Sequence, residues 1–179
     1  MLDQIAGITR VRMLYLQLLY RCNFSCRHCF HGELLKSADS FSLSEAQAVL
    51  NHFADVYQLE AVTFLGGEPL LYPHIVDICA FAKQRGLTVE ICTNAHSGFR
   101  NRIRALATVL DKFRVSLDGL ETSHDAMRQH GSFGGALEMV ADWPFGHTIL
   151  ALTALGLIAF GLFAVVEACL RPMRLHTLG

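Results

Sequence analysis

Three cysteines stand close together near the start of the chain, in the segment RCNFSCRHC, at positions 22, 26 and 29. Thiolates at this spacing on a loop can point toward one centre and bind iron or zinc. A cluster of four irons normally takes four cysteines, so three cysteines leave one iron open to a small molecule. The alternative is a structural zinc ion with His28 or His31 as its fourth ligand. The triplet Cys22, Cys26 and Cys29 leaves both interpretations open.

A second segment with unusual residues, Gly66 to Pro69 (GGEP), directly follows a short apolar run. Its glycines allow a ligand to approach the backbone closely, and Glu68 supplies a carboxylate that can meet a cationic amino group. A structural zinc ion needs no such companion. The segment therefore favours an open iron–sulfur cluster with an organic ligand beside it.

Both segments need elements that hold them together, and the apolar pattern predicts such elements. Strands are predicted at 13–20, 61–65, 88–92 and 113–117, and helices are predicted between them from the Ser42 and Glu45 capping box, from Pro73 and around 102–110. This β-α-β-α-β-α-β order predicts an α/β fold with parallel strands and helical crossovers. Because loops at the carboxyl ends of parallel strands meet, four unusual loops should converge on one site.

The cysteine triplet after the first strand and GGEP after the second resemble the radical SAM superfamily over residues 10–141. The resemblance implies an oxidoreductase with a [4Fe–4S] cluster and S-adenosylmethionine (SAM). An electron from an external donor then cleaves SAM to methionine and a 5′-deoxyadenosyl radical. It also implies a partial barrel, which is incomplete here because only about four parallel strands are predicted and no fifth or sixth follows.

The resemblance also assigns individual residues. Cys22, Cys26 and Cys29 would bind the cluster, His28 would lie beside the adenine, and GGEP would bind the SAM amino group. The positions matched to SAM are His28, Gly66, Gly67, Glu68, Pro69, Thr93, Asn94, Ser116 and Asp118. The alternative is that Thr93 and Asn94 only end a strand, and that Asp118 with Gly119 forms an ordinary turn.

The segment SLDGLETSHDAMRQHGSF resembles the subgroup that modifies peptides or matures peptide-derived cofactors and sulfatases. This implies a peptide or peptide-derived substrate and makes Arg128 a clamp for a carboxylate of the cofactor. The alternative is that His124, Asp125 and Arg128 only cap and decorate a short surface helix.

Residues 142–179 differ in character from the rest and are expected to form a separate hydrophobic helix with a short basic tail. Thr148 to Val166 contains nineteen residues without charge, which passes the length of about 18 expected of a membrane span. The segment resembles the last helix of a bacterial family of small multi-span membrane proteins of unknown function. We expect a transmembrane anchor; the alternative is an apolar helix buried in the protein core.

The whole-chain composition bears on partners and location. The formal net charge of −1 gives no reason to expect a nucleic-acid partner. The N-terminal MLDQIAGITRVR lacks the pattern of a secretory signal, so we expect a cytoplasmic catalytic domain with reduced thiols.

The membrane interpretation contains a conflict. Arg171 and Arg174 after the apolar segment would place the C-terminus in the cytoplasm, which the cluster domain also requires. One crossing cannot satisfy both, which favours a tail joined to a truncated enzyme, or a helix that is not a simple span. The alternative function is then a truncated, non-catalytic remnant that binds cluster or SAM and is tethered to a membrane.

Overall fold

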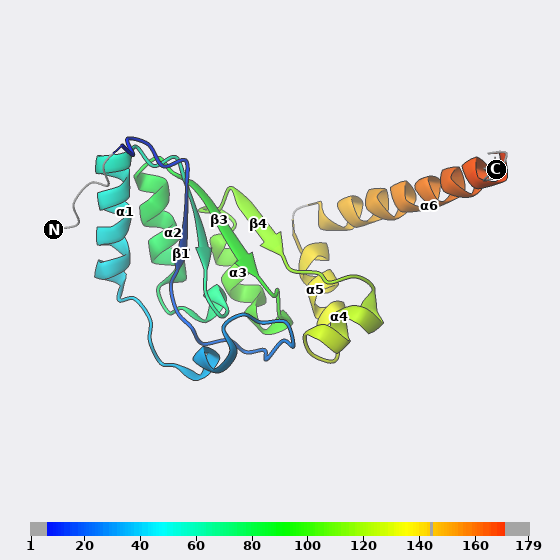
Figure 1. Cartoon of the computed structure of the whole chain (residues 1–179), viewed down its shortest axis with the longest axis horizontal. Helices are drawn as coiled ribbons and strands as arrows, with labels where there is room; N and C mark the ends of the chain where they lie inside the picture. Colours follow the sequence, from blue (N-terminus) through cyan, green and yellow to red (C-terminus); the bar gives the residue numbers. More distant parts are fainter. Residues whose placement is uncertain (1–6, 144, 171–179) are drawn as a thin grey trace, which may run out of the picture. The chain divides into compact units, whose positions relative to one another are not determined.

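The computed structural model describes residues 7–143 and 145–170. Four strands, β1 (Met13–Gln17), β2 (Ala61–Leu65), β3 (Thr88–Thr93) and β4 (Lys112–Val115), form one parallel sheet in the order of the chain. The helices α1 (Leu43–Tyr57), α2 (Ile75–Gln84) and α3 (Arg100–Leu106) connect consecutive strands and lie side by side on one face of the sheet (Figure 1). The predicted α/β class and its four parallel strands are confirmed.

Local sequence signals account for these elements. At the start of α1, the Glu45 N–H donates to the Ser42 hydroxyl and the Ser42 N–H donates to the Glu45 carboxylate, so the predicted capping box is present. The helix ends at Tyr57, and its C-cap residue Gln58 adopts a left-handed conformation with φ 49°. Short 3-10 helices follow three of the strands: η1 (Gly32–Lys36), η2 (Pro69–Leu71) and η3 (Ser97–Phe99).

Side chains alternate between the two faces of the sheet. The face under α1 to α3 carries the core residues of the strands, Leu16, Val62, Phe64, Val89 and Ile91. The other face carries exposed Tyr15 but also buried Thr63 and Glu90. The Glu90 carboxylate is bonded by the Arg114 guanidinium at 2.6 Å and by the Thr63 hydroxyl at 3.3 Å, so this buried charge is paired.

Both outer strands end earlier than the sequence predicts. The ladder between β1 and β2 ends at Gln17, although the Leu18 N–H still donates to the Leu65 carbonyl at 3.0 Å. Residues 18–20 also pair with residues 39–41, where the Tyr20 N–H donates to the Asp39 carbonyl. Strand β4 ends at Val115, which is the partner of Thr93 at the end of β3. Within the described residues β4 pairs only with β3, so its other edge is open.

After β4 come α4 (Glu121–Met127), α5 (Ser132–Ala141) and α6 (Gly146–Leu170). The chain divides into two compact units, Met1–Met139 and Val140–Gly179. The predicted long apolar C-terminal helix is present as α6, whose segment Gly146–Glu167 has a mean hydropathy of 2.7 and is long enough to cross a bilayer. Arg171 and Arg174 lie outside the described residues.

Candidate functional site

A single pocket of about 230 Å³ lies at the carboxyl ends of the four strands. Its walls come from the loops after β1, β2, β3 and β4, as parallel strands require. The pocket is lined by Cys22, Cys26 and Cys29 from the first loop and by Glu68, Asn94 and Ser116 from the other three. A larger hollow of about 420 Å³ along Leu16 to Tyr20 contains none of the predicted site residues.

The loop after β2 packs directly on the start of the cysteine loop, by which we mean residues 21–31. The Gly67 N–H donates to the Leu19 carbonyl and the Glu68 N–H donates to the Arg21 carbonyl, both at 3.0 Å. A Cβ atom at Gly67 would lie 2.1 Å from the Tyr20 carbonyl oxygen. Only glycine permits this approach of two backbones, so the glycine pair of GGEP is required by the fold as well as by any ligand.

Glu68 ties the ends of β2 and β3 together. Its carboxylate, 1% exposed, accepts hydrogen bonds from the Thr93 hydroxyl at 2.6 Å, the Asn94 N–H at 2.8 Å and the Leu70 N–H at 3.0 Å. Burial raises the pKa of Glu68 above its ordinary value, and these three donors oppose the rise. The carboxylate predicted to meet a ligand amino group therefore already has three partners within the protein.

The three cysteines of the loop are free thiols that are neither buried nor fully exposed. Burial raises the pKa of Cys22 to about 11, against a hydrogen bond that its sulfur accepts from the Phe24 N–H at 3.3 Å. Burial also raises the pKa of Cys26, and the nearby Arg128 guanidinium opposes this rise. Metal binding must therefore displace protons from these thiols.

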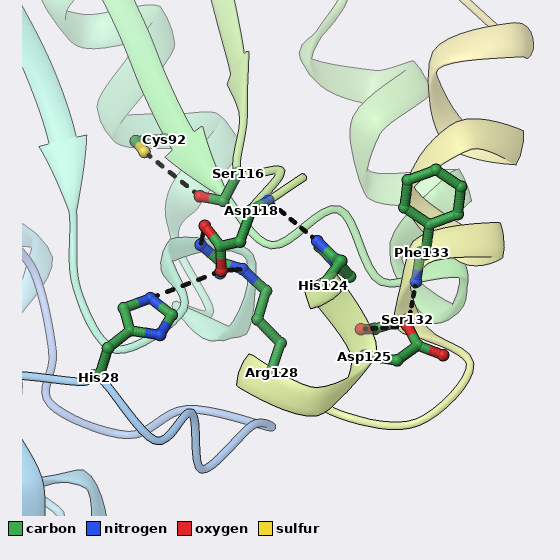
Figure 2. Close-up of polar contacts among 9 residues, drawn as sticks. All are labelled: His28, Cys92, Ser116, Asp118, His124, Asp125, Arg128, Ser132 and Phe133. Atoms are coloured by element: carbon green, nitrogen blue, oxygen red, sulfur yellow. Dashed lines mark hydrogen bonds and ion pairs between the residues drawn. The ribbon is translucent and has the colours of Figure 1, made fainter. Parts of the chain in front are cut away.

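The ends of β3 and β4 hold the remaining polar groups of the pocket. Asn94 reaches the cysteine loop, since its side-chain N–H donates to the Asn23 side chain at 2.8 Å. The Ser116 hydroxyl lies 3.9 Å from the sulfur of Cys92 (Figure 2). Cys92 was not predicted as a site residue, although its place at the end of a strand was a usable signal.

Arg128 and Asp118 face each other beside the pocket (Figure 2). The Arg128 Nε and Nη2 atoms donate to the two Asp118 oxygens at 2.7 and 3.2 Å, and His28 Nε2 lies 3.6 Å from the same carboxylate. The Arg128 hydrogen bonds hold the pKa of Asp118 below its ordinary value. The carboxylate that Arg128 clamps in this structure is therefore Asp118.

All predicted site residues except Pro69 and Asp118 line the pocket. Pro69 is buried at the start of η2, and Asp118 lies behind Arg128 and His28. His31, which the sequence named only as an alternative zinc ligand, also lines the pocket, and the sequence did not single out five further lining residues, which are Gln17, Phe24, Phe30, Leu65 and Cys92. Most are apolar or aromatic, and only two carried a signal by their position: Phe30, directly after Cys29, and Cys92, at the end of a strand.

The donor set of the pocket fits an iron–sulfur cubane with one open position. Three free thiols line one pocket, and they are close enough for Cys26 and Cys29 to raise the pKa of Cys22 by charge repulsion. In the described part of the chain, no group of three Cys, His, Asp or Glu side chains surrounds a single ion position. A cubane does not require that convergence, because each thiolate binds its own iron.

Comparisons with known proteins agree with this geometry. The model of the "Radical SAM superfamily" matches residues 16–143, and that of a "Domain of Unknown Function (DUF1206)" matches residues 122–171. The Fe-coproporphyrin III synthase of Methanosarcina barkeri is 30% identical over 120 residues, covering 65% of this chain and 30% of that protein. The PqqA peptide cyclase of Rhodopseudomonas palustris is 33% identical over 132 residues, covering 72% of this chain and 34% of that protein.

Solved structures share the fold. Streptococcus suis SuiB bound to its precursor peptide SuiA aligns with a TM-score of 0.66 at 18% identity, over 74% of this chain and 30% of that chain. SuiB bound to S-adenosylmethionine aligns with a TM-score of 0.63 at 18% identity, over 74% and 31%. The chain thus spans about a third of the length of each of these relatives.

Proposed function

The chain belongs to the radical SAM superfamily, and we propose that its pocket binds a [4Fe–4S] cluster through Cys22, Cys26 and Cys29, with SAM beside it. The observation that carries this proposal is the convergence of three free thiols and the GGEP backbone in one pocket at the carboxyl ends of four parallel strands. When bound, the cluster and SAM supply reductive cleavage to a 5′-deoxyadenosyl radical, with the electron coming from an external donor.

The protein's own residues orient the cofactor. Gly66 and Gly67 have no side chains, so the cofactor's amino group can reach the backbone of the GGEP loop. Glu68 fixes that loop to β3 through Thr93 and Asn94, and Pro69 presets the first turn of η2.

Two further side chains complete the proposed contacts. The half-exposed ring of His28 is available beside the adenine. The Ser116 hydroxyl, which lies 3.9 Å from the sulfur of Cys92, remains available to a polar atom of the cofactor.

For the substrate we propose a peptide or peptide-derived molecule. The support is similarity to a peptide cyclase over 72% of the chain, and a shared fold with SuiB, which has been solved with its precursor peptide. The face of the sheet away from α1 to α3 leads to the pocket through Gln17, Leu65 and Cys92. A substrate on this face would lie next to the cofactor.

A second candidate is a protein that binds the cofactors without turnover. It is favoured by the edge of β4, which pairs with no further strand in the described residues. The two candidates differ in one product. Dithionite-reduced, cluster-loaded protein should convert SAM to 5′-deoxyadenosine if it is an enzyme, whereas an intact cluster without this product would establish the binding protein.

Two variants make that assay specific. Cys26→Ala should abolish 5′-deoxyadenosine formation, because it removes a proposed cluster ligand. Cys169→Ala is the matched control, since Cys169 is an exposed thiol of α6 and should be dispensable. Equal product from wild type and Cys26→Ala would refute the ligand assignment.

For the C-terminal helix we propose a membrane anchor, with residues 10–141 as a cytoplasmic catalytic domain and residues 142–179 as the anchor. The support is the length and mean hydropathy of Gly146–Glu167. The full chain should stay with membranes after an alkaline carbonate wash. Leu157→Arg should release it, because a charge at the centre of a span costs about 2.5–3.5 kcal/mol. Thr153→Ala is the control, and release of the unaltered chain would contradict the proposal.

A further inference from the structure

The cysteine loop is held at two separate places. Its first part is fixed by the ends of β2 and β3, through the bond from the Glu68 N–H to the Arg21 carbonyl and the bond from Asn94 to Asn23. Phe24 anchors the same part, with only 3% of its surface exposed. Cys22 therefore has a fixed position that does not depend on the residues after β4.

The second part of the loop, which carries Cys26 and Cys29, is attached to the segment after β4. The Arg27 N–H donates to the Met127 carbonyl at the end of α4, at 2.9 Å. His28 Nε2 lies 3.6 Å from the Asp118 carboxylate (Figure 2). Both contacts depend on where α4 and Asp118 lie.

Asp118 and α4 are joined by Arg128, the residue that caps α4. The side chain of Arg128 is only 13% exposed and donates two roughly parallel bonds to Asp118, an arrangement stronger and more directional than a surface ion pair. The Asp118 N–H in turn donates to Nδ1 of the fully buried His124, at 3.2 Å. The Asp118–Arg128 pair thus links the segment after β4 to the end of α4, and both of these contact the cysteine loop.

Helix α4 is also attached to the start of α5, so α4 is held by contacts on both sides. The Asp125 carboxylate accepts bonds from the Gly131 and Phe133 N–H groups at the start of α5, at 2.5 and 3.0 Å. His124 packs edge-on against the Phe133 ring, with centroids 5.7 Å apart (Figure 2). Movement of the second part of the loop then requires its contacts with the Met127 carbonyl and the Asp118 carboxylate to break, and the Asp118–Arg128 pair helps to hold both of these groups in place.

We propose that Arg128, paired with Asp118, is a positioning residue that sets where Cys26 and Cys29 stand relative to Cys22. The inference rests on the proposed role of these cysteines as cluster ligands. It gives Arg128 a role other than clamping the cofactor's carboxylate. It also places a guanidinium near Cys26, where its positive charge would favour the reduced form of a bound cluster.

The test measures amide hydrogen exchange in the metal-free, reduced full chain in detergent. Asp118→Asn and Arg128→Gln should each speed exchange about tenfold for amides of residues 26–29, because the retaining contact opens. Amides of residues 22–24 and of β3 should keep their wild-type rates. The double variant should be no faster than either single variant, since the two residues act as one unit.

Lys83→Ala provides the matched control. Lys83 forms a comparable two-oxygen ion pair with Asp111, at 2.7 and 2.9 Å, before the amino end of β4 and away from the cysteine loop. This variant should leave exchange of residues 26–29 unchanged. If Arg128→Gln speeds exchange only in α4 and not at residues 26–29, the pair merely caps the helix and the proposal is wrong.

Two further measurements keep the test decisive. If Arg128→Gln loses protection in β3 as well, it has unfolded, and Arg128→Lys, which cannot donate two parallel bonds, replaces it in the same comparison. In cluster-loaded protein, Arg128→Gln should bind less iron and have a more negative cluster potential than wild type, and unchanged values for both would refute the positioning role. If wild type takes up no cluster, the proposed function fails, while the exchange measurement still tests the pair.

Discussion

Replacing Gly67 with alanine should disturb the site more than any other change of one methyl group. The new Cβ would lie 2.1 Å from the Tyr20 carbonyl oxygen, 2.4 Å from the Arg21 carbonyl oxygen and 2.6 Å from the Arg21 carbonyl carbon. All three are backbone atoms, so no side-chain rotation can relieve the contact. The two loops must separate.

The cost follows from the bonds that this separation breaks. The Gly67 and Glu68 N–H groups would lose their partners on Leu19 and Arg21, at 3.0 Å each. Each such bond contributes about 0.5–1.5 kcal/mol, and overpacking adds about 1–3 kcal/mol. We expect the free energy of unfolding to fall by about 2–6 kcal/mol, out of the roughly 5–15 kcal/mol typical of a domain.

Urea unfolding of the metal-free protein measures this loss, and iron content after anaerobic reconstitution measures its effect on the site. Gly134→Ala is the control, because a Cβ there meets nothing within 4 Å. Since Gly134 lies inside α5, alanine should be neutral or stabilise by up to about 1 kcal/mol. A Gly67→Ala protein within about 0.5 kcal/mol of wild type, with normal iron content, would refute the argument from close approach.

Three other predictions test the electrostatics. Glu68→Gln should lower the free energy of unfolding by about 1–3 kcal/mol in urea titrations, because an amide NH₂ would face the N–H of Asn94 or Leu70; an unchanged midpoint would contradict the network. Arg114→Ala should lower the free energy of unfolding by about 1–3 kcal/mol and Glu90→Gln by less than about 1 kcal/mol, because only Arg114→Ala leaves a buried carboxylate without its cation. A larger loss for Glu90→Gln than for Arg114→Ala would be inconsistent with the pairing.

The last of these concerns pH. Arg128 lowers the pKa of Asp118 in the folded state. The stability that the ionised Asp118 contributes to the fold is therefore complete above the ordinary aspartate pKa of about 3.9, and it is lost as the pH falls through the lower pKa of the folded state. Asp118→Asn should therefore flatten the acid limb of the stability curve, measured by thermal melts between about pH 5 and 2. An acid limb identical to that of wild type would count against the pair.

The fold was predictable because its signals are local. Four short apolar runs, each followed by glycine or polar residues, placed the four strands, and Ala61–Leu65 agrees at both ends. The capping box at Ser42 and Glu45 placed α1 for the same reason. The predicted ends of β1 and β4 were wrong because a strand stops where its partner strand stops, as β4 does opposite the end of β3. For β1, the pairing of Leu19 with Ser40 also has no local signature in the sequence.

The site was only partly predictable. Motif spacing placed the cysteines and GGEP in one pocket, since the carboxyl ends of parallel strands share an edge. Which groups satisfy one another depends on three-dimensional contact. Glu68 accepts hydrogen bonds from Thr93 and Asn94, and Arg128 pairs with Asp118, ten residues before it in the chain. Neither the partners of Glu68 nor the partner of Arg128 could be identified from residue spacing alone.

The central claim is that one pocket holds a cluster on three cysteines with SAM beside it, and electron paramagnetic resonance tests it most directly. Anaerobically reconstituted protein, reduced with dithionite, should contain about four irons per chain and give a signal of a reduced [4Fe–4S] cluster that changes when SAM is added. Cys26→Ala should lose the signal, and Cys169→Ala should keep it. A colourless protein that holds one zinc ion, or a cluster signal that SAM leaves unchanged, would contradict the claim.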